Sequence, residues 1–402
     1  TFNQRTPSAP RVRSSPRFTT AAQLSSWAPK YPNPMSSSVT HSVDSDGVGW
    51  IVFDDPSSRA NVFNPAVHSD LRAAVAALAA QSVRAVVIAS AKERIFIAGA
   101  DLKWLNKLPD PAAATAASRD GQASFDQVAG FKVPVVCAIH GACAGGGYEL
   151  ALACHWRIAS DARETVIGLP ETGIGTIPGW GGTARLPRLV GAKAALDHIL
   201  KAALVPAAEA KAAGLVDEVV PAKELKTRAK AAALRLAAEG FPVRSVPPAA
   251  GSEIFAKLRQ DVAKRTRGRE PAPLAAIEVI EKTAGRTLTE ALAEEARVFG
   301  GIMVGETCRN LIHVFFLKEA VKKLSVDAWF PPAAAAAPAS FRKIGVVGAG
   351  VMGSGIAQWC AARGHEVVLR DVKPEFVERG LTVIRGVFDE AVARKKMTPE
   401  TA

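Results

Sequence analysis

The sequence contains no run of about 18 apolar residues, the length that a membrane-spanning helix needs. Its longest Ala-rich stretches are interrupted by charged residues. We therefore expect a soluble protein that is not transmembrane. With 402 residues and 48% hydrophobic composition, the chain has enough material for two or three domains with substantial cores.

Cysteine is also scarce, and the few cysteines lack the spacing of metal ligands. They are odd in number and lie in apolar surroundings: Cys137, Cys143, Cys154, Cys308 and Cys360. We expect reduced thiols inside the core, a reducing compartment and no metal site. A cytoplasmic location fits this pattern.

Acidic residues are absent from residues 1–43, which contain five Arg or Lys and many Ser, Pro and Thr. We expect this basic extension to be disordered. It has the composition of an organelle transit peptide, which would place the protein in the mitochondrial matrix. Met35 alternatively resembles a natural start just before the first strand, and residues 1–34 would then be an artefactual or nonfunctional extension.

The net charge of +12 raises the question of nucleic-acid binding. About five of these charges lie in the extension, and the remainder is only mildly basic. The aromatic interleaving expected of a single-strand binder is missing. We therefore expect no nucleic-acid partner. A modest positive excess also suits a phosphate-bearing substrate such as a coenzyme A thioester.

The stretch from Pro134 to Arg185 contains the residues that most clearly indicate catalysis. An apolar run is followed by the glycines 145–147 and then by Glu149 in an apolar helical pattern, and Glu171 follows 22 residues later. A strand that breaks into glycines before a helix lets N–H groups point into a cleft, where the helix favours an oxyanion. The stretch predicts acid–base chemistry beside a developing oxyanion.

The surrounding segments alternate between strands and helices. We expect strands at 49–55, 84–90, 133–140, 156–160 and 215–221, and helices at 64–78, 118–130, 147–153 and 222–240. Strand, helix and strand at this spacing predict an α/β fold with parallel pairing. In FIAGADLKWL, Gly99 marks a bend and Ala100 follows it, so a second N–H donor could be presented there.

Three motifs resemble those of the crotonase (enoyl-CoA hydratase/isomerase) family. They are FIAGADLKWL, AIHGACAGGGYELALAC and GLPETGIGTIPGWGGTARLPRLVG, in that order over about 90 residues. The resemblance implies a spiral of ββα turns with an acyl-CoA thioester bound across it. It also implies an oxyanion hole from the N–H groups of Ala100 and Gly146, and a catalytic pair, Glu149 and Glu171. Further substrate contacts would come from Ala98, Gly99 and Asp101.

The implied reaction is hydration of a 2-enoyl-CoA to a 3-hydroxyacyl-CoA in fatty-acid β-oxidation, with Δ3,Δ2-enoyl-CoA isomerisation as an additional expectation. Similarity to the hydratases assigns water activation to Glu149 and protonation of C2 to Glu171. His140 follows the strand without a nucleophile motif, and Cys143 has no basic partner in the sequence. We interpret both as structural residues.

Residues 251–330 read as a separate helical section with an apolar period near 3.6. They resemble the connecting helices of multifunctional fatty-acid oxidation proteins, specifically the α subunit, in which a crotonase-like part precedes a 3-hydroxyacyl-CoA dehydrogenase. That resemblance also suggests an oligomer and a thiolase subunit as a partner. The Pro- and Ala-rich residues 331–340 read as a linker.

The segment after the linker carries a dinucleotide-binding fingerprint. A strand is followed by Gly348, Gly350 and Gly353 in the pattern GxGxxG, then by a helix, a second strand and Asp371. The glycines would admit the pyrophosphate to the helix N-terminus, and Asp371 would bind the adenine ribose of NAD. The motif is similar to that of 3-hydroxyacyl-CoA dehydrogenases, with Met352 near the cofactor.

The sequence stops at Ala402, after about 60 residues of a domain that needs some 150 or more. We therefore expect a partial NAD site and no hydride transfer by this chain, although a full-length parent would be a dehydrogenase. The noncatalytic alternative is an acyl-CoA- or NAD-binding fragment. The expected architecture is α/β, divided into an extension (1–43), a crotonase-like domain (44–250), a helical segment (251–330), a linker (331–340) and a partial Rossmann domain (341–402).

Overall fold

The computed structural model describes residues 37–242, 251–322, 341–394, 396–399 and 401. Contacts divide the chain into two compact units, before and after Lys318, and each is described by itself. Most of the predicted disordered extension and the predicted linker lie outside the described residues. Within the described part, no helix has both the length and the apolar character to cross a membrane.

The first unit is built around a six-stranded sheet with the order β1-β2-β3-β5-β7-β10. Its strands are β1 (Val39–Val43), β2 (Val48–Phe53), β3 (Ala85–Ser90), β5 (Val135–Ile139), β7 (Trp156–Ser160) and β10 (Glu218–Val220). Every neighbouring pair from β2 to β10 is parallel, as the strand–helix–strand spacing predicts. The side chains of β5 are all buried, because helices cover both faces of the sheet.

Strand β1 corrects the predicted boundary of the extension. Residues 39–43 pair antiparallel with β2, so the ordered fold begins before Gly49. Only Val39 of this strand is buried, whereas the next four residues are exposed. The polar sequence of an edge strand that faces water carries little hydrophobic signal, which explains why the segment resembled the disordered stretch before it.

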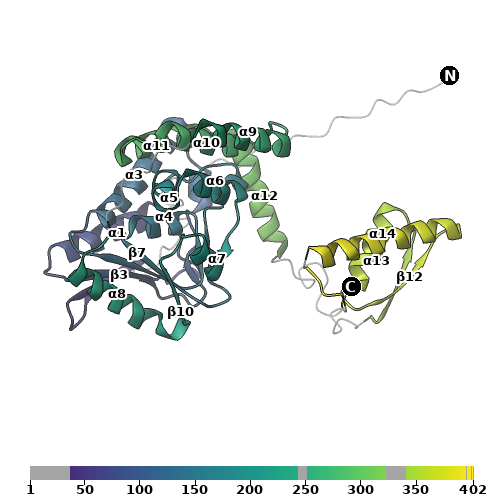
Figure 1. Ribbon diagram of the computed structural model, residues 1–402, viewed down its shortest axis with the longest axis horizontal. Helices are drawn as coiled ribbons and strands as arrows, with labels where there is room; N and C mark the ends of the chain where they lie inside the picture. Colours follow the sequence, from purple (N-terminus) through teal and green to yellow (C-terminus); the bar gives the residue numbers. More distant parts are fainter. Residues whose placement is uncertain (1–36, 243–250, 323–340, 395, 400, 402) are drawn as a thin grey trace, which may run out of the picture. The chain divides into compact units, whose positions relative to one another are not determined.

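Helices cover the two faces of this sheet (Figure 1). On one face, α8 (Leu225–Glu239) packs against β3, β5 and β7. The other face carries α1 (Pro65–Ala79), α3 (Pro111–Ala129) and α4 (Gly146–Ala153). The helix predicted at 222–240 begins with a 3-10 turn, η3 (Ala222–Glu224), and the helix predicted at 118–130 begins earlier, at Pro111, with Asp110 as its N-cap.

A second sheet of very short strands is connected to the segments that contain the three sequence motifs. Its order is β4-β6-β8-β9, formed by β4 (Ile95–Ile97), β6 (Ala142–Ala144), β8 (Val166–Gly168) and β9 (Val205–Pro206). The segments directly after three of these strands are α2 (Leu102–Leu105), α4 and the 3-10 helix η2 (Glu171–Ile174). This sheet therefore brings the three sequence motifs together.

The later helices of the first unit pack on its core. Helices α5 (Gly182–Val190) and α6 (Ala192–Lys201) lie beneath α9 (Ser252–Thr266), α10 (Pro271–Thr283) and α11 (Leu288–Met303) in Figure 1, and α7 (Ala207–Ala212) lies beside β9 and β10. Helix α11 contacts α3 and α5 extensively. The helical section, as far as Lys318 in α12 (Glu306–Lys322), lies in the same compact unit as the two sheets.

The second unit has the order expected at the start of a Rossmann domain. Strands β11 (Lys343–Val347) and β12 (Glu366–Arg370) pair in parallel, joined by α13 (Val351–Ala361) and followed by α14 (Pro374–Ala393). Its described surface exposes large apolar side chains, among them Val347, Val351 and Val372.

Candidate active site

A cavity of about 700 Å³ opens in the first unit, where the three motifs meet. It is lined by all seven residues that the crotonase resemblance singled out: Ala98, Gly99, Ala100, Asp101, Gly146, Glu149 and Glu171. Ala98–Asp101 follow β4, Gly146 and Glu149 belong to α4, and Glu171 begins η2. The sequence prediction therefore identified residues from three segments that share one cavity.

The three glycines before Glu149 are needed because other groups approach their backbone closely. A Cβ atom at Gly145, whose φ is +52°, would lie 2.6 Å from Oε1 of Glu171. At Gly146 it would lie 2.5 Å from the ring of Trp180, and at Gly147 it would lie 2.4 Å from the carbonyl oxygen of Ile97. Side chains here would push α4, the Glu171 carboxyl and β4 apart.

Two backbone N–H groups of the cavity are available to a ligand. Among the described residues, no hydrogen-bond acceptor is found for the N–H of Ala100 or for that of Gly146. The neighbours of Ala100 are held instead: Phe63 N–H donates to the oxygen of Gly99 at 2.8 Å, and Asp101 N–H donates to the oxygen of Phe63 at 2.8 Å. The Ala100 peptide is thus rigidly placed with its donor unused.

Glu149 is held by the turn that starts α5. Its Oε1 accepts hydrogen bonds from the N–H groups of Trp180 at 2.7 Å and of Gly182 at 2.8 Å. Burial raises the pKa of Glu149 well above its ordinary value, and the charges of Glu171 and Glu295 add to this rise. The two N–H donors oppose it, because they stabilise the ionised carboxylate.

Glu171 lies in the first turn of η2, directly after Pro170. Its Oε2 is buried and has no hydrogen-bond partner among the described residues. Burial raises the pKa of Glu171 to about 8, and the charge of Glu295 contributes to the rise. A carboxyl with such a pKa is protonated at neutral pH and has an oxygen free to donate its proton.

Glu295 of α11 is a buried carboxylate of this region that the sequence analysis did not single out. It is 0% exposed and accepts hydrogen bonds from the N–H groups of Gly181 at 2.6 Å and Thr183 at 2.8 Å. One signal was readable: Glu295 shares a helix face with the buried residues Ala291 and Phe299, at helical spacing. From the sequence alone, however, an isolated Glu in an amphipathic helix is predicted to face solvent.

The cavity wall also includes aromatic residues that lie far away in sequence. Phe299 of α11 and the pair Phe315 and Phe316 of α12 line it together with Trp180. Thr176 also lines it, and the buried hydroxyl of Thr176 has no partner among the described residues. The helical segment therefore forms part of the candidate site.

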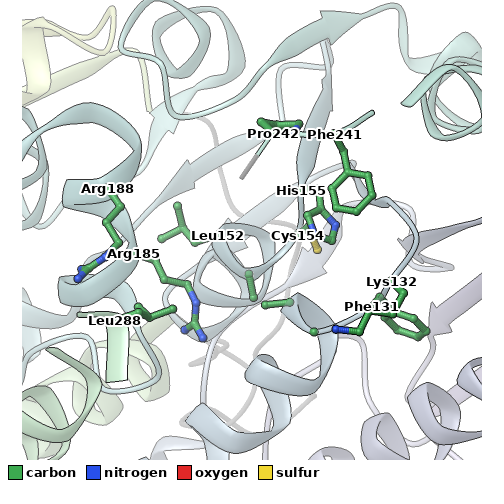
Figure 2. Close-up of a pocket in the computed structure, with 13 residues that line it drawn as sticks. Phe131, Lys132, Leu152, Cys154, His155, Arg185, Arg188, Phe241, Pro242 and Leu288 are labelled. Carbon is green, nitrogen blue, oxygen red and sulfur yellow. The ribbon is translucent and has the colours of Figure 1, made fainter. Parts of the chain in front are cut away.

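A second cavity, of about 500 Å³, lies among different residues and contains none of the predicted site residues. Figure 2 shows Arg185 and Arg188 on one side of it and His155 and Phe241 on the other. The Arg185 guanidinium already donates to the carbonyl of Trp180 at 3.1 Å and to Asp126 at 2.5 Å. None of the described residues that line this cavity carries a carboxylate, so it is not the candidate catalytic centre.

His140 and the cysteines have the structural surroundings that the sequence predicts. Nδ1 of His140 lies 2.8 Å from Oγ of Ser160, and His140 is not among the residues that line the larger cavity. All five cysteines are buried and free, and burial raises the pKa of Cys143 well above its ordinary value. A thiol in that state is a poor nucleophile. Within the described residues, no cluster of three metal-ligating side chains is found.

The glycine loop of the second unit fits a dinucleotide. Gly348 has a φ of +99°, and a Cβ at Gly353 would lie 1.7 Å from the Gly348 oxygen, whereas nothing lies within 4 Å of one at Gly350. The loop is therefore tight on its inner side and open where a pyrophosphate would approach α13. Asp371 accepts a hydrogen bond from Ala349 N–H at 2.6 Å, so its carboxylate borders this loop, and Met352 is exposed.

Comparison with known proteins decides the family. The family model for enoyl-CoA hydratase/isomerase matches residues 44–246, half of the chain. The chain belongs to the enoyl-CoA hydratase/isomerase family. The model for the NAD-binding domain of 3-hydroxyacyl-CoA dehydrogenase matches residues 343–402, after the hydratase/isomerase part and the helical segment. The two matches agree with the predicted order of a crotonase-like part and the beginning of a Rossmann domain.

Solved structures resemble the hydratase/isomerase part. Human mitochondrial Δ3,Δ2-enoyl-CoA isomerase is similar with a TM-score of 0.52 and 23% identity, over 71% of this chain and 100% of the human protein. An enoyl-CoA hydratase from Bacillus anthracis is 28% identical over 70% of this chain and 96% of its own, with a TM-score of 0.47. The first likeness establishes the crotonase fold.

Proposed function

We propose that this chain catalyses the reversible addition of water to a 2-trans-enoyl-CoA, giving a 3-hydroxyacyl-CoA. The observation that carries the proposal is the placement of Glu149 and Glu171 in one cavity with the unused N–H groups of Ala100 and Gly146. A reaction that needs a base, an acid and an oxyanion site at once would use all four groups.

The oxyanion donors would stabilise the enolate. As oxygen adds at C3, negative charge moves onto the thioester carbonyl oxygen, which would accept hydrogen bonds from Ala100 and Gly146. Removing one donor of this kind typically costs about 3 to 4 kcal/mol of barrier. The positive end of α4, which begins at Gly146, favours the same charge.

The two carboxyls would divide the proton transfers. Glu149 takes the proton of the attacking water as its oxygen bonds to C3, and Glu171 gives its own proton to C2, so one proton enters and one leaves the pair. The hydrogen bonds to Glu149 favour its ionised form, while the unpartnered Oε2 and the raised pKa of Glu171 favour its protonated form. Because the pair is coupled, its titration belongs to both groups.

Δ3,Δ2-isomerisation is the second candidate activity of the same site. It removes a proton from C2 of a 3-enoyl thioester and returns one to C4 through a dienolate, whose charge lies on the same carbonyl oxygen, so it needs the oxyanion donors and only one carboxyl. The presence of two carboxyls favours hydration as the principal reaction. A chain that binds acyl-CoA without catalysis is the remaining alternative.

The test is a hydration assay with crotonyl-CoA, in which the enoyl chromophore disappears. We expect turnover by the wild-type chain and a fall in kcat of about 10² to 10⁴ in Glu149→Gln and in Glu171→Gln. A parallel assay with a 3-enoyl-CoA reports isomerisation. If one variant loses hydration but keeps isomerisation, the two reactions use the carboxyls differently.

Glu239→Gln is the matched control. Glu239 lies at the end of α8, pairs with Arg235 and has a side chain that is 65% exposed. Its substitution should leave kcat and KM unchanged. An inactive wild-type chain, or full activity in both active-site variants, would reject the hydratase proposal.

The second unit is proposed to contribute to NAD binding through the glycine loop and Asp371, which fits the match to a dehydrogenase NAD-binding domain. Bound NAD would supply a hydride acceptor for 3-hydroxyacyl-CoA chemistry, and for the described residues we propose binding alone, without hydride transfer. The residues of this chain in that task would be the glycines that admit the pyrophosphate and Asp371 beside the ribose. We also propose a role in fatty-acid β-oxidation, which the two family matches in one chain support.

A further inference from the structure

A second carboxylate shares the turn that holds Glu149. Glu295 of α11 accepts four hydrogen bonds, and among the described residues it has no hydrogen bond to an acceptor, which would require it to be protonated. The donors are the N–H of Gly181 at 2.6 Å, the N–H of Thr183 at 2.8 Å, the hydroxyl of Thr183 at 2.7 Å and the amide of Gln122 at 2.9 Å. Such a set of donors favours the ionised carboxylate.

The N–H groups of the turn alternate between the two carboxylates. The turn consists of residues 180–183, where Trp180 and Gly182 donate to Glu149 and the intervening Gly181 and Thr183 donate to Glu295. Gly181 has a φ of +113°, which points successive N–H groups to different sides. The first N–H groups of α5 have no partners within the helix, so two carboxylates can share them.

The carbonyl groups next to this turn are held as well. The Gly179 oxygen accepts from Ser118 Oγ at 2.5 Å and from Gln122 at 3.3 Å, and the Trp180 oxygen accepts from Arg185 at 3.1 Å. Gln122 also donates to the oxygen of Leu292 in α11 at 3.0 Å. The position of the turn that donates hydrogen bonds to Glu149 thus depends on contacts from α3 and α11.

We propose that Glu295 is a positioning residue for Glu149, because it fixes the turn 180–183 whose other N–H groups orient the Glu149 carboxylate. The proposal rests on the proposed function in one respect only: the orientation matters for catalysis if Glu149 handles the proton of the attacking water. Without Glu295, two N–H groups would lose their acceptor in a buried place, and the turn would rearrange to satisfy them.

The charge of Glu295 adds a second, measurable effect. Burial is the main cause of the raised pKa of Glu149 and of Glu171, and the charge of Glu295 adds to both. Burial also raises the pKa of Glu295 itself, and its hydrogen-bond donors and Arg185, which is paired with Asp126, oppose that rise. These are the charged groups that face Glu295 from α4, η2, α5 and α3. Neutralising Glu295 should therefore move the pH profile of the catalytic pair to lower pH.

The kinetic test compares Glu295→Gln with its neighbour Glu294→Gln. Glu294 of the same helix is half-buried, pairs with Arg297 and Lys282 and has no hydrogen bond to the turn 180–183 among the described residues, so it is a matched control. We expect Glu295→Gln to lower kcat for crotonyl-CoA hydration about 10- to 100-fold with little change in KM, and to shift both limbs of the kcat/KM profile to lower pH. Glu294→Gln should behave as wild type.

Thr183 provides a milder pair of variants in case Glu295→Gln does not fold. Thr183→Val removes one donor to Glu295 and should lower kcat, whereas Thr183→Ser keeps the hydroxyl and should restore it. Thr183→Val and Glu295→Gln should be non-additive, because both act on the same turn. Wild-type kcat and an unshifted pH profile in folded Glu295→Gln, or in Thr183→Val, would overturn the proposal.

A crystal structure of Glu295→Gln separates this proposal from the proposed function. We expect the bond between Trp180 N–H and Glu149 Oε1 to lengthen beyond 3.5 Å, whatever reaction the site catalyses. If that bond remains near 2.7 Å, the positioning role is wrong even in an active hydratase. If it breaks but Glu149→Gln keeps full hydration activity, the positioning role stands and the hydratase assignment fails.

Discussion

Glu149 and Glu295 accept hydrogen bonds from adjacent residues of one turn, Trp180 N–H at 2.7 Å and Gly181 N–H at 2.6 Å. One carboxylate belongs to the glycine motif of α4, and the other belongs to a helix beyond the segment that the family model matches. The geometry of the candidate catalytic base therefore depends on a part of the chain outside the recognised domain.

The raised pKa of Glu171 predicts the alkaline limb of the activity profile. If Glu171 donates its proton to C2, kcat/KM should fall as the pH rises through about 8, because the carboxyl then loses that proton. The residual activity of Glu171→Gln should lack this fall, while Glu239→Gln should keep it. A wild-type profile that stays level well above pH 8 would contradict the assignment of the acid.

Gly146→Ala should damage the oxyanion site. The added methyl group would lie 2.5 Å from the Trp180 ring, so either the ring or the Gly146 N–H must move. We expect kcat to fall about 10²- to 10³-fold, as for the loss of one oxyanion donor. Gly301→Ala, in α11 with nothing within 4 Å of the new methyl, should keep full activity. Equal kinetics in the two variants would argue against this role of Gly146.

His68 predicts a loss of stability in mild acid. It is buried against Phe63 and Trp180, and burial lowers the pKa of His68 to about 4. The unfolded chain therefore binds a proton near pH 6.5 that the folded chain takes up only near pH 4. Stability should fall as the pH drops through this window, by up to about 1.4 kcal/mol per pH unit.

His68→Leu removes that titration. Urea unfolding at pH 5 and pH 7 should show a smaller difference in the free energy of unfolding for the variant than for wild type. The same pH dependence in both proteins would mean that His68 is not the group responsible.

Gly353→Ala tests whether a disturbance of the second unit affects the hydration reaction proposed for the first. A methyl there would lie 1.7 Å from the Gly348 oxygen, so the loop between β11 and α13 cannot keep its conformation. We expect faster amide hydrogen exchange in β11, α13 and β12, with hydration kinetics unchanged because every candidate catalytic residue lies in the first unit. Gly355→Ala, with open space around the new methyl, is the control. A large loss of hydration by Gly353→Ala would show coupling between the units.

The sequence predicted the features whose causes are local. The central strands of the first sheet are continuous apolar runs because both of their faces are buried. The glycines before Glu149 predict that other groups approach the backbone closely there. The motifs then placed Glu149 and Glu171 in one cavity, because each lies directly after a short strand of the same small sheet.

The missed features depend on distant contacts. The strands of the second sheet are two or three residues long, too short for a periodic pattern. The bond from Gly181 to Glu295 spans 114 residues, and the helix that carries Glu295 shows an ordinary amphipathic pattern. Nothing local distinguishes a carboxylate that holds a turn from one that faces water.

The late position of α11 bears on how the protein folds during synthesis. About 50 residues separate the end of the family match from Glu295, and at about 5 to 20 residues per second the ribosome needs roughly 3 to 10 seconds to add them. During that interval the hydratase/isomerase part can collapse, but the N–H groups of Gly181 and Thr183 lack their acceptor. During synthesis the chain therefore passes through a stage in which the glycine turn before Glu149 can form, while the turn 180–183 lacks its acceptor and the aromatic wall from α11 and α12 is still missing from the cavity.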